Sequence, residues 1–229
     1  PHQQHQTLIE GIFAGNIFDL GSNATASMFN QNKDFDFHTT RSKLQPRPWL
    51  IDDLDIWLKQ IAVPSTYQCA LLFVDNAGPD VLLGMIPFAR HLLSQGTRVI
   101  LTANSKPSLN DVTDRELHHL LHQISTWDTP LRQARDRNEL LLVPSGNAAP
   151  LIDLAMIGPE LSQVLKKTTI DLLVLEGMGR AIESNFDASF ATRLALREKQ
   201  VQQNYRPVIG IHKWFARRPG SIFRSLPWR

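Results

Sequence analysis

The stretch LLFVDNAGPDVLLG, residues 71–84, joins an apolar run to a second apolar segment through a polar turn. The first run ends at Asp75 and Asn76, and Gly78 and Pro79 stand before the second segment. A short, continuous apolar run is typical of a strand that is covered on both faces. The stretch therefore predicts a buried strand followed by a helix. It also raises the question of why such a strand ends in a carboxylate beside a carboxamide.

Apolar runs and amphipathic segments alternate through the middle of the chain. The runs that predict strands lie at residues 70–74, 97–102, 139–143 and 170–175. The segments that predict helices between them lie at residues 79–94, 110–124 and 150–166. Buried strands separated by helices are typical of a parallel sheet with helices on both faces. We therefore expect an α/β fold, a doubly wound and mostly parallel sheet, preceded by a short N-terminal helical segment.

The chain is expected to have three parts. Residues 1–61 form a helical segment and a connector, residues 62–190 form the α/β core, and residues 191–229 form a basic tail that has no acidic residue after Glu198. Within the first part, the expected elements are a helical region at residues 1–30, a polar connector at residues 31–48 and a short helix at residues 49–61.

Composition narrows the possible classes of protein. The chain has 229 residues, 42% of them hydrophobic, which is enough for one sizeable core. Its net charge of +2 does not favour nucleic acid as a partner. No apolar run approaches the ~18–20 residues that a membrane span needs, so no membrane partner is expected. The one cysteine, Cys69, excludes a disulfide within the chain, which favours a reducing, cytoplasmic location.

Polar or small residues follow every predicted strand. In chain order they are Asp75 and Asn76; Asn104 and Ser105, then Asn110 and Asp111; Ser145, Gly146 and Asn147; and Glu176, Gly177, Gly179 and Arg180. Ligands of an open parallel sheet bind beyond the carboxyl ends of its strands. We therefore expect these residues to meet at one edge of the sheet and to form one site.

Two carboxylates and a carboxamide among these residues suit a hard divalent cation. Asp75, Asn76 and Asp111 offer oxygen atoms, which Mg²⁺ and Mn²⁺ prefer. The alternative is structural: Asp111 would cap a helix that starts near Val112, and Asp75 would serve a turn. The residues alone leave both interpretations open.

Small residues at the other strand ends indicate a phosphate ligand beside such a cation. Backbone amides at Ser145, Gly146 and Gly177 could approach an anion closely. Arg180 could donate two parallel hydrogen bonds to a phosphate, or it could form a surface ion pair with Glu183. Neither a Walker A sequence nor GxGxxG occurs, so the sequence favours neither a nucleoside triphosphate nor a dinucleotide.

Four blocks of the sequence, in order, resemble the damage-control phosphatase family. They are IEGIFAGNIFDLG (9–21), LLFVDNAGPDVLLGMIPFARHLLSQGTRVILTANSKPSLNDVT (71–113), VPSGNAAPLIDL (143–154) and DLLVLEGMGRAIESNFDA (171–188). The similar branch is the one fused behind a pantothenate kinase 4-type domain in animals and standing alone in plants. The resemblance implies metal-dependent hydrolysis of a small phosphorylated metabolite, with 4′-phosphopantetheine or its damaged forms as the favoured substrate class.

The resemblance also implies roles for single residues. The metal ligands would be Asp75, Asn76 and Asp111, holding Mg²⁺, Mn²⁺, Co²⁺ or Ni²⁺, and the two aspartates would act in catalysis. The strand would thus end in Asp-Asn in order to hold a cation. The residues expected to bind substrate, from the resemblance or from their place at strand ends, are Asn16, Asn104, Ser145, Gly146, Glu176, Gly177 and Arg180.

Two mechanisms are compatible with these residues. In the first, a metal-bound water attacks the phosphate, and Asp75 or Asp111 accepts a proton. In the second, Asp75 is the nucleophile and forms an aspartyl phosphate. The sequence does not separate them.

The resemblance ends near residue 190, where the family would continue with a segment that carries a phosphate-binding lysine. Residues 212–226, HKWFARRPGSIFRSL, instead resemble the opening block of certain adenine-specific DNA methyltransferases, without their catalytic or cofactor motifs. Two other functions therefore stay open. The chain could be a catalytically weakened relic that binds a phosphorylated metabolite without hydrolysing it, or it could bind nucleic acid through its basic tail.

Overall fold

The structure, a computed structural model, describes residues 2–18, 36–49, 52–61, 66–150, 152–153 and 156–177. Residues Pro1–Arg180 form one compact unit. The predicted tail at residues 191–229 lies outside the described residues, and the predicted three-part division stays a prediction. No helix in the described part of the chain combines the length and the apolar character that crossing a bilayer requires.

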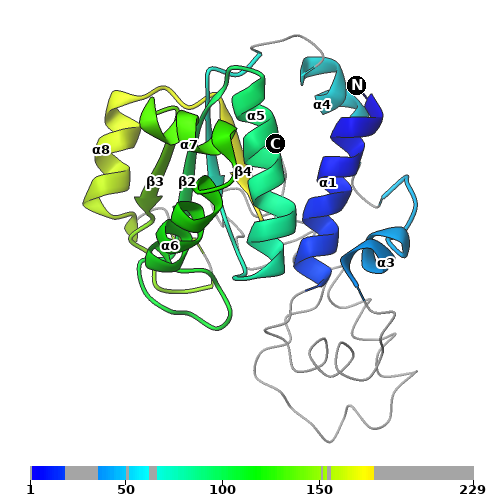
Figure 1. Cartoon of the computed structure of the whole chain (residues 1–229), viewed down its shortest axis with the longest axis horizontal. Helices are drawn as coiled ribbons and strands as arrows, with labels where there is room; N and C mark the ends of the chain where they lie inside the picture. Colours follow the sequence, from blue (N-terminus) through cyan, green and yellow to red (C-terminus); the bar gives the residue numbers. More distant parts are fainter. Residues whose placement is uncertain are drawn as a thin grey trace, which may run out of the picture. The chain divides into compact units, whose positions relative to one another are not determined.

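A four-stranded parallel sheet lies at the centre of this unit (Figure 1). Its strands are β1 (Cys69–Phe73), β2 (Arg98–Ala103), β3 (Leu140–Pro144) and β4 (Leu172–Leu175). They are arranged in the order β3-β2-β1-β4, and every pair of neighbours is parallel. The prediction of an α/β fold with a parallel sheet is therefore confirmed, and each strand begins and ends within two residues of its predicted limits.

Helices cover both faces of the sheet because β1 is apolar on both of its faces. Ala70 and Leu72 pack against one layer of helices, whereas Leu71 and Phe73 face the other layer. The first layer consists of α5 (Ile86–Ser94), α6 (Asp114–Ser125) and α7 (Thr129–Asp136), and the second layer contains α8 (Pro159–Lys167). Burial of every residue of β1 explains why its sequence is a continuous apolar run rather than an alternating pattern.

The N-terminal part contains α1 (His2–Ile17), α3 (Phe37–Ser42) and α4 (Leu54–Ile61). The predicted polar connector at residues 31–48 contains a short helix, α3, that the sequence analysis did not predict. The side chain of Asp36 caps this helix by accepting a hydrogen bond from the backbone N–H of Thr39 (2.7 Å). The helix predicted from residue 49 begins only at Leu54, since Arg47 holds the preceding loop through Asp52 and Asp55.

The helix that follows β1 opens with a π-helical turn, η1 (Asp80–Met85), before it continues as α5. Helix α1 packs directly on this turn, as α1 and α5 lie side by side in Figure 1. Glycines permit the close approach: a Cβ at Gly15 would lie 3.1 Å from the Cα of Asp80, and one at Gly84 would lie 3.1 Å from the Cα of Ile12. The π-turn and its contact with α1 are features that apolar spacing does not predict.

Two other helices differ from their predicted limits. Helix α6 begins at Asp114 rather than near residue 110, because Thr113 and Glu116 form a capping box. The suggestion that Asp111 caps this helix is therefore wrong. The helix predicted at residues 150–166 begins only at Pro159, and α7 was not predicted at all.

The strand order creates a switch point between β1 and β4. The chain passes from β1 outward to β2 and β3, and then returns to add β4 on the other side of β1. Connections diverge at such a point, and ligands of open α/β sheets ordinarily bind there, beyond the carboxyl ends of the strands. Asp75 follows β1 and Glu176 follows β4, so both residues stand at this point.

Candidate metal centre and active site

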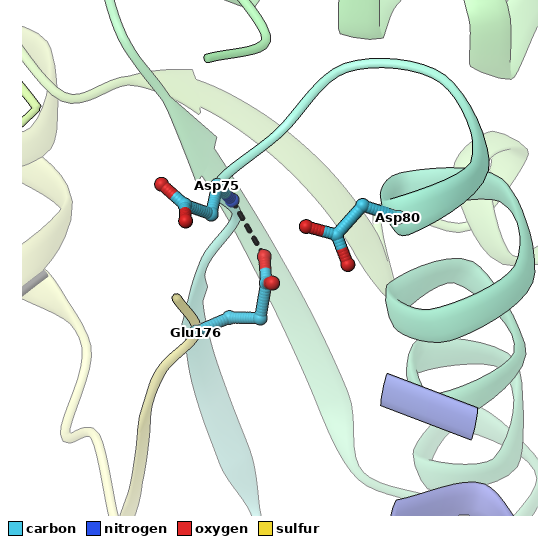
Figure 2. A group of neighbouring side chains, drawn as sticks. All are labelled: Asp75, Asp80 and Glu176. Atoms are coloured by element: carbon cyan, nitrogen blue, oxygen red, sulfur yellow. Dashed lines mark hydrogen bonds between the residues drawn. The ribbon is translucent and has the colours of Figure 1, made fainter. Parts of the chain in front are cut away.

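Three buried carboxyl groups meet at the switch point. Asp75 comes from the end of β1, Glu176 from the end of β4, and Asp80 from the first position of η1. One oxygen atom of each lies within 4.8 Å of the others, and Figure 2 shows the carboxylates of Asp80 and Glu176 pointing toward each other, with Asp75 beside them. The exposed fractions of Asp75, Asp80 and Glu176 are 6%, 0% and 3%. Carboxylates brought together in this way, away from water, are suited to a cation.

The pairing of β1 with β4 holds the first two of these acids together. The backbone N–H of Asp75 donates to Oε2 of Glu176 (2.6 Å; Figure 2), and the N–H of Glu176 donates to the carbonyl of Phe73 (3.1 Å). Gly177 has a φ of +91°, and a Cβ at this position would overlap the carboxylate of Asp75. Glycine is therefore required at this position both for its backbone conformation and for the space that Asp75 occupies.

Asn16 brings α1 into the site. Its Nδ2 donates to Asp80 Oδ2 and to Glu176 Oε1, both at 3.1 Å, and lies 3.5 Å from Asp75 Oδ2. One amide group thus contacts all three carboxyl groups. Among these residues, Asn16, Asp75 and Glu176 were predicted from the sequence as site residues, and the structure brings them together.

Asp80 is the site residue that the sequence analysis missed. Its Oδ2 accepts hydrogen bonds from the backbone N–H of Asn76 (3.3 Å) and from Asn76 Nδ2 (2.9 Å), whereas its Oδ1 has no hydrogen-bond partner in the described part of the chain. In sequence, Asp80 opens an apolar helix, a position where an acid ordinarily stabilises the helix dipole. The sequence signal that points to Asp80 is its position four residues after Asn76, which is about one helical turn.

Burial shifts the pKa values of Glu176 and Asp80. It raises the pKa of Glu176 well above its ordinary value, and the charge of Asp80 adds to that rise. Burial also raises the pKa of Asp80. Within the described residues, no ion pair joins either acid to a lysine or an arginine. A divalent cation held through Asp75 beside these two acids would compensate buried charge, so the acidic cluster fits such an ion.

The raised pKa of Glu176 predicts how stability depends on pH. A carboxyl group whose pKa is raised by folding binds its proton more tightly in the folded state, so it favours folding at low pH and opposes it as pH rises through the folded pKa. In metal-free protein, the free energy of unfolding of Glu176→Gln minus that of wild type is therefore expected to increase from pH 5 to pH 8. Urea unfolding at each pH in the presence of a chelator measures it. A difference that is flat or that falls with pH would contradict the prediction.

Asp111 lies at the same edge of the sheet but outside the three-acid cluster. The N–H of Val112 donates to the carbonyl of Asp75 (2.8 Å), and Asn76 and Asp111 form an isolated antiparallel bridge. Oδ2 of Asp111 accepts from Asn104 Nδ2 (2.8 Å). The structure thus holds the backbone of Asp111 against that of Asn76, and its predicted role as a ligand stays a prediction.

The loop after β3 is held in place by hydrogen bonds and close packing with neighbouring residues. The N–H of Gly146 donates to Ser105 Oγ (2.8 Å), and the buried Ser145 accepts from the N–H of Asn147 (3.1 Å). Gly146 has a φ of +85°, and a Cβ there would overlap the backbone of Gly158. These contacts account for Ser145 and Gly146 structurally, so a role in substrate binding stays a prediction. Arg180 lies outside the described residues.

The chain belongs to the damage-control phosphatase family. The sequence model of the damage-control phosphatase ARMT1-like domain matches residues 1–210. The match continues past residue 190, where the sequence analysis had ended the resemblance. Membership of the family agrees with the resemblance found in the sequence.

Curated relatives belong to the same group of proteins. A damage-control phosphatase of Arabidopsis thaliana is 43% identical over 185 residues, which are 81% of this chain and 49% of that protein. Pantothenate kinase 2 of Arabidopsis thaliana is 39% identical over an alignment of 224 residues, and the match covers 85% of this chain and 24% of that protein. The 4′-phosphopantetheine phosphatase of Mus musculus is 32% identical over an alignment of 233 residues, and the match covers 81% of this chain and 28% of that protein. The chain thus spans about half the length of the first relative, and about a quarter of the other two.

A solved structure was also matched. It is that of a DUF89 family protein from Pyrococcus horikoshii, with 12% sequence identity and a TM-score of 0.42, and the match covers 72% of this chain and 50% of that one.

Proposed function

We propose that this chain is a metal-dependent phosphomonoesterase that acts on 4′-phosphopantetheine or its damaged forms. The observation that carries the proposal is the cluster of Asp75, Asp80 and Glu176 at the switch point of a parallel sheet, in a chain of this family. The named activities of the mouse and Arabidopsis relatives support the reaction class and the substrate. The single cysteine supports a cytoplasmic location as part of the same proposal.

A divalent cation would be held through Asp75. This residue belongs both to the ligand set expected from the sequence, with Asn76 and Asp111, and to the acidic cluster of the structure. Once bound, Mg²⁺, Mn²⁺, Co²⁺ or Ni²⁺ would neutralise charge on the phosphate and lower the pKa of a bound water. Further from the cation, Asn16, Glu176 and Asp80 would fix the position of Asp75 and Asn76 through the hydrogen bonds described above.

Two carboxylates of the chain could accept the proton that the attacking water releases. Asp111 is oriented by Asn104, which donates to its Oδ2, and Asp75 is anchored through its own backbone N–H on Glu176. In the alternative mechanism, Asp75 attacks the phosphorus and displaces the protonated alcohol of the substrate, and water then hydrolyses the aspartyl phosphate to release inorganic phosphate and free Asp75. Both mechanisms need the Asp75 carboxylate at the end of β1, which makes this residue the decisive one for the proposal.

Removal and return of the metal tests the proposal. Chelated protein is expected to hydrolyse neither p-nitrophenyl phosphate nor 4′-phosphopantetheine, and addition of Mg²⁺, Mn²⁺, Co²⁺ or Ni²⁺ is expected to restore release of phosphate at least 100-fold above the chelated baseline. 4′-Phosphopantetheine is expected to have the higher kcat/KM. Equal turnover with and without metal would contradict the proposed mechanism. Metal binding without turnover would instead support the relic that binds without hydrolysing.

A further inference from the structure

The carboxamide of Asn76 is held between an acceptor and a donor. Its Nδ2 donates to Asp80 Oδ2 (2.9 Å), and its Oδ1 accepts from Asn110 Nδ2 (2.7 Å). The two ends of a carboxamide have nearly the same shape, so their assignment must come from the partners. For a metal ligand this assignment is critical, because only the oxygen has lone pairs to offer and the NH₂ group can only donate.

Asp80 is the partner that decides the assignment. Oδ2 of Asp80 already accepts from the backbone N–H of Asn76 (3.3 Å) and from Asn16 Nδ2 (3.1 Å), so this atom is an acceptor and only the NH₂ group of Asn76 can face it. Asn110 carries a carboxamide of its own, which has both a donor and an acceptor and so does not by its chemistry select one end of Asn76. Asp80 therefore places the carboxamide oxygen of Asn76 on the side away from itself. The hydrogen bond from Asn110 to that oxygen is a consequence of this orientation.

The surroundings of Asp80 fix its carboxylate firmly enough to act in this way. The side chain is fully buried, and its Oδ2 also accepts from the backbone N–H of Asn76 (3.3 Å) and from Asn16 Nδ2 (3.1 Å). Its Oδ1 faces α1, since a Cβ at Gly15 would lie 3.0 Å from that atom. The close packing of α1 on η1 thus leaves Asp80 no room to turn away from Asn76.

We infer that Asp80 is a positioning residue that orients the carboxamide oxygen of Asn76 toward the divalent cation. The inference rests on the proposed function, because it needs that cation. Asp80 acts through Asn76 in this scheme and contacts neither substrate nor water. Loss of such a supporting hydrogen bond ordinarily weakens metal binding by about 10- to 100-fold.

The first test measures metal affinity rather than activity. Isothermal titration of chelated protein with Mn²⁺ is expected to give a Kd about 10- to 100-fold higher for Asp80→Asn than for wild type. Asp80→Ala, which removes both oxygens without adding bulk, is expected to behave in the same way, so the result does not depend on one variant. Thermal unfolding of each metal-free variant checks that it is folded. An unchanged Kd in the folded variants would overturn the inference.

The second test separates orientation from general support. In Asn76→Asp, both terminal atoms are oxygens, so no orientation has to be selected. Adding Asp80→Asn to that variant is expected to leave the Kd for Mn²⁺ unchanged or lower it, because the addition removes repulsion between two carboxylates. An equal weakening by Asp80→Asn in both backgrounds would show that Asp80 only supports the loop, and would overturn the inference.

A third measurement needs no metal. In chelated wild-type protein, NMR is expected to find slow solvent exchange of the Asn76 side-chain NH₂ protons, and faster exchange in Asp80→Ala. Exchange at the same rate in both proteins would count against the contact.

Asp128→Asn is the matched control for a loss of stability alone. Asp128 caps α7 by accepting from the N–H of Leu131 (2.9 Å) and pairs with Arg90, so its replacement costs stability away from the site. The Kd for Mn²⁺ is expected to stay at the wild-type value in this variant. If the wild type binds Mn²⁺ but hydrolyses no phosphate ester, the proposed function is wrong and this inference still stands. Wild type that binds no divalent metal would overturn both.

Discussion

Asp75→Asn is expected to lower metal-dependent turnover by about 10³-fold or more, equivalent to about 4 kcal/mol of lost transition-state stabilisation. The substitution keeps the size of the side chain but removes a negative charge from the only acid shared by the sequence-predicted ligand set and the cluster in the structure. Both candidate mechanisms also use this carboxylate. Steady-state assays with p-nitrophenyl phosphate at saturating Mn²⁺ measure the loss.

The same variant is expected to lose its stabilisation by metal. A ligand present at 100 times its Kd raises the free energy of unfolding by about 2.7 kcal/mol, so the chelated and the Mn²⁺-loaded wild type should unfold at clearly different temperatures. For Asp75→Asn the two temperatures should nearly coincide. Asp136→Asn, the same substitution at an exposed position on α7, is the control and should keep both turnover and the metal-induced shift. Turnover within tenfold of wild type in Asp75→Asn would place the catalytic carboxylate elsewhere.

Gly177→Ala is expected to have the second largest effect, a loss of turnover of about 100-fold together with a loss of about 2 kcal/mol of stability. The φ of +91° at Gly177 strains any residue with a Cβ, and that atom would also overlap the Asp75 carboxylate. To relieve the overlap, Asp75 must leave its place beside Glu176. Turnover and urea unfolding measured on the same preparation report the two effects.

Gly78→Ala separates strain from overlap. Gly78 has a similar φ of +79°, but a Cβ there would meet nothing within 4 Å. This variant should lose about 1 kcal/mol from backbone strain alone, and at least ten times less turnover than Gly177→Ala. Equal losses of turnover in the two variants would mean that the contact with Asp75 has no special importance.

Strands were predictable from the sequence because burial on both faces leaves a simple pattern. The run ALLFV, residues 70–74, has no polar residue to interrupt it, and β1 lies within one residue of that prediction. The limits of helices were less predictable, because local polar contacts fix them. The start of α6 depends on the hydrogen bonds between Thr113 and Glu116, a Thr-x-x-Glu pattern that was present in the sequence and outweighs apolar spacing.

The candidate site was predictable only where it follows the strands. Asp75 and Glu176 lie within two residues of the ends of β1 and β4, so the rule for parallel sheets is sufficient to bring them together. Asp80 joins them only because η1 opens with a π-turn and because Gly15 lets α1 approach closely. Apolar spacing encodes neither the π-turn nor the approach of α1, and the interval of one helical turn between Asn76 and Asp80 is the sequence signal that points to Asp80.

The contact between Asn16 and Glu176 has a consequence for the order of events during synthesis. The two residues are 160 positions apart in the chain. At about 5–20 residues per second, roughly 8–32 s separate their appearance on a ribosome. Helix α1 is thus made before every strand of the sheet, yet the amide of Asn16 reaches the last of its three acids only after β4 has joined the sheet. The contact of Asn16 with the three-acid cluster can therefore form only after both ends of the described part of the chain have come together.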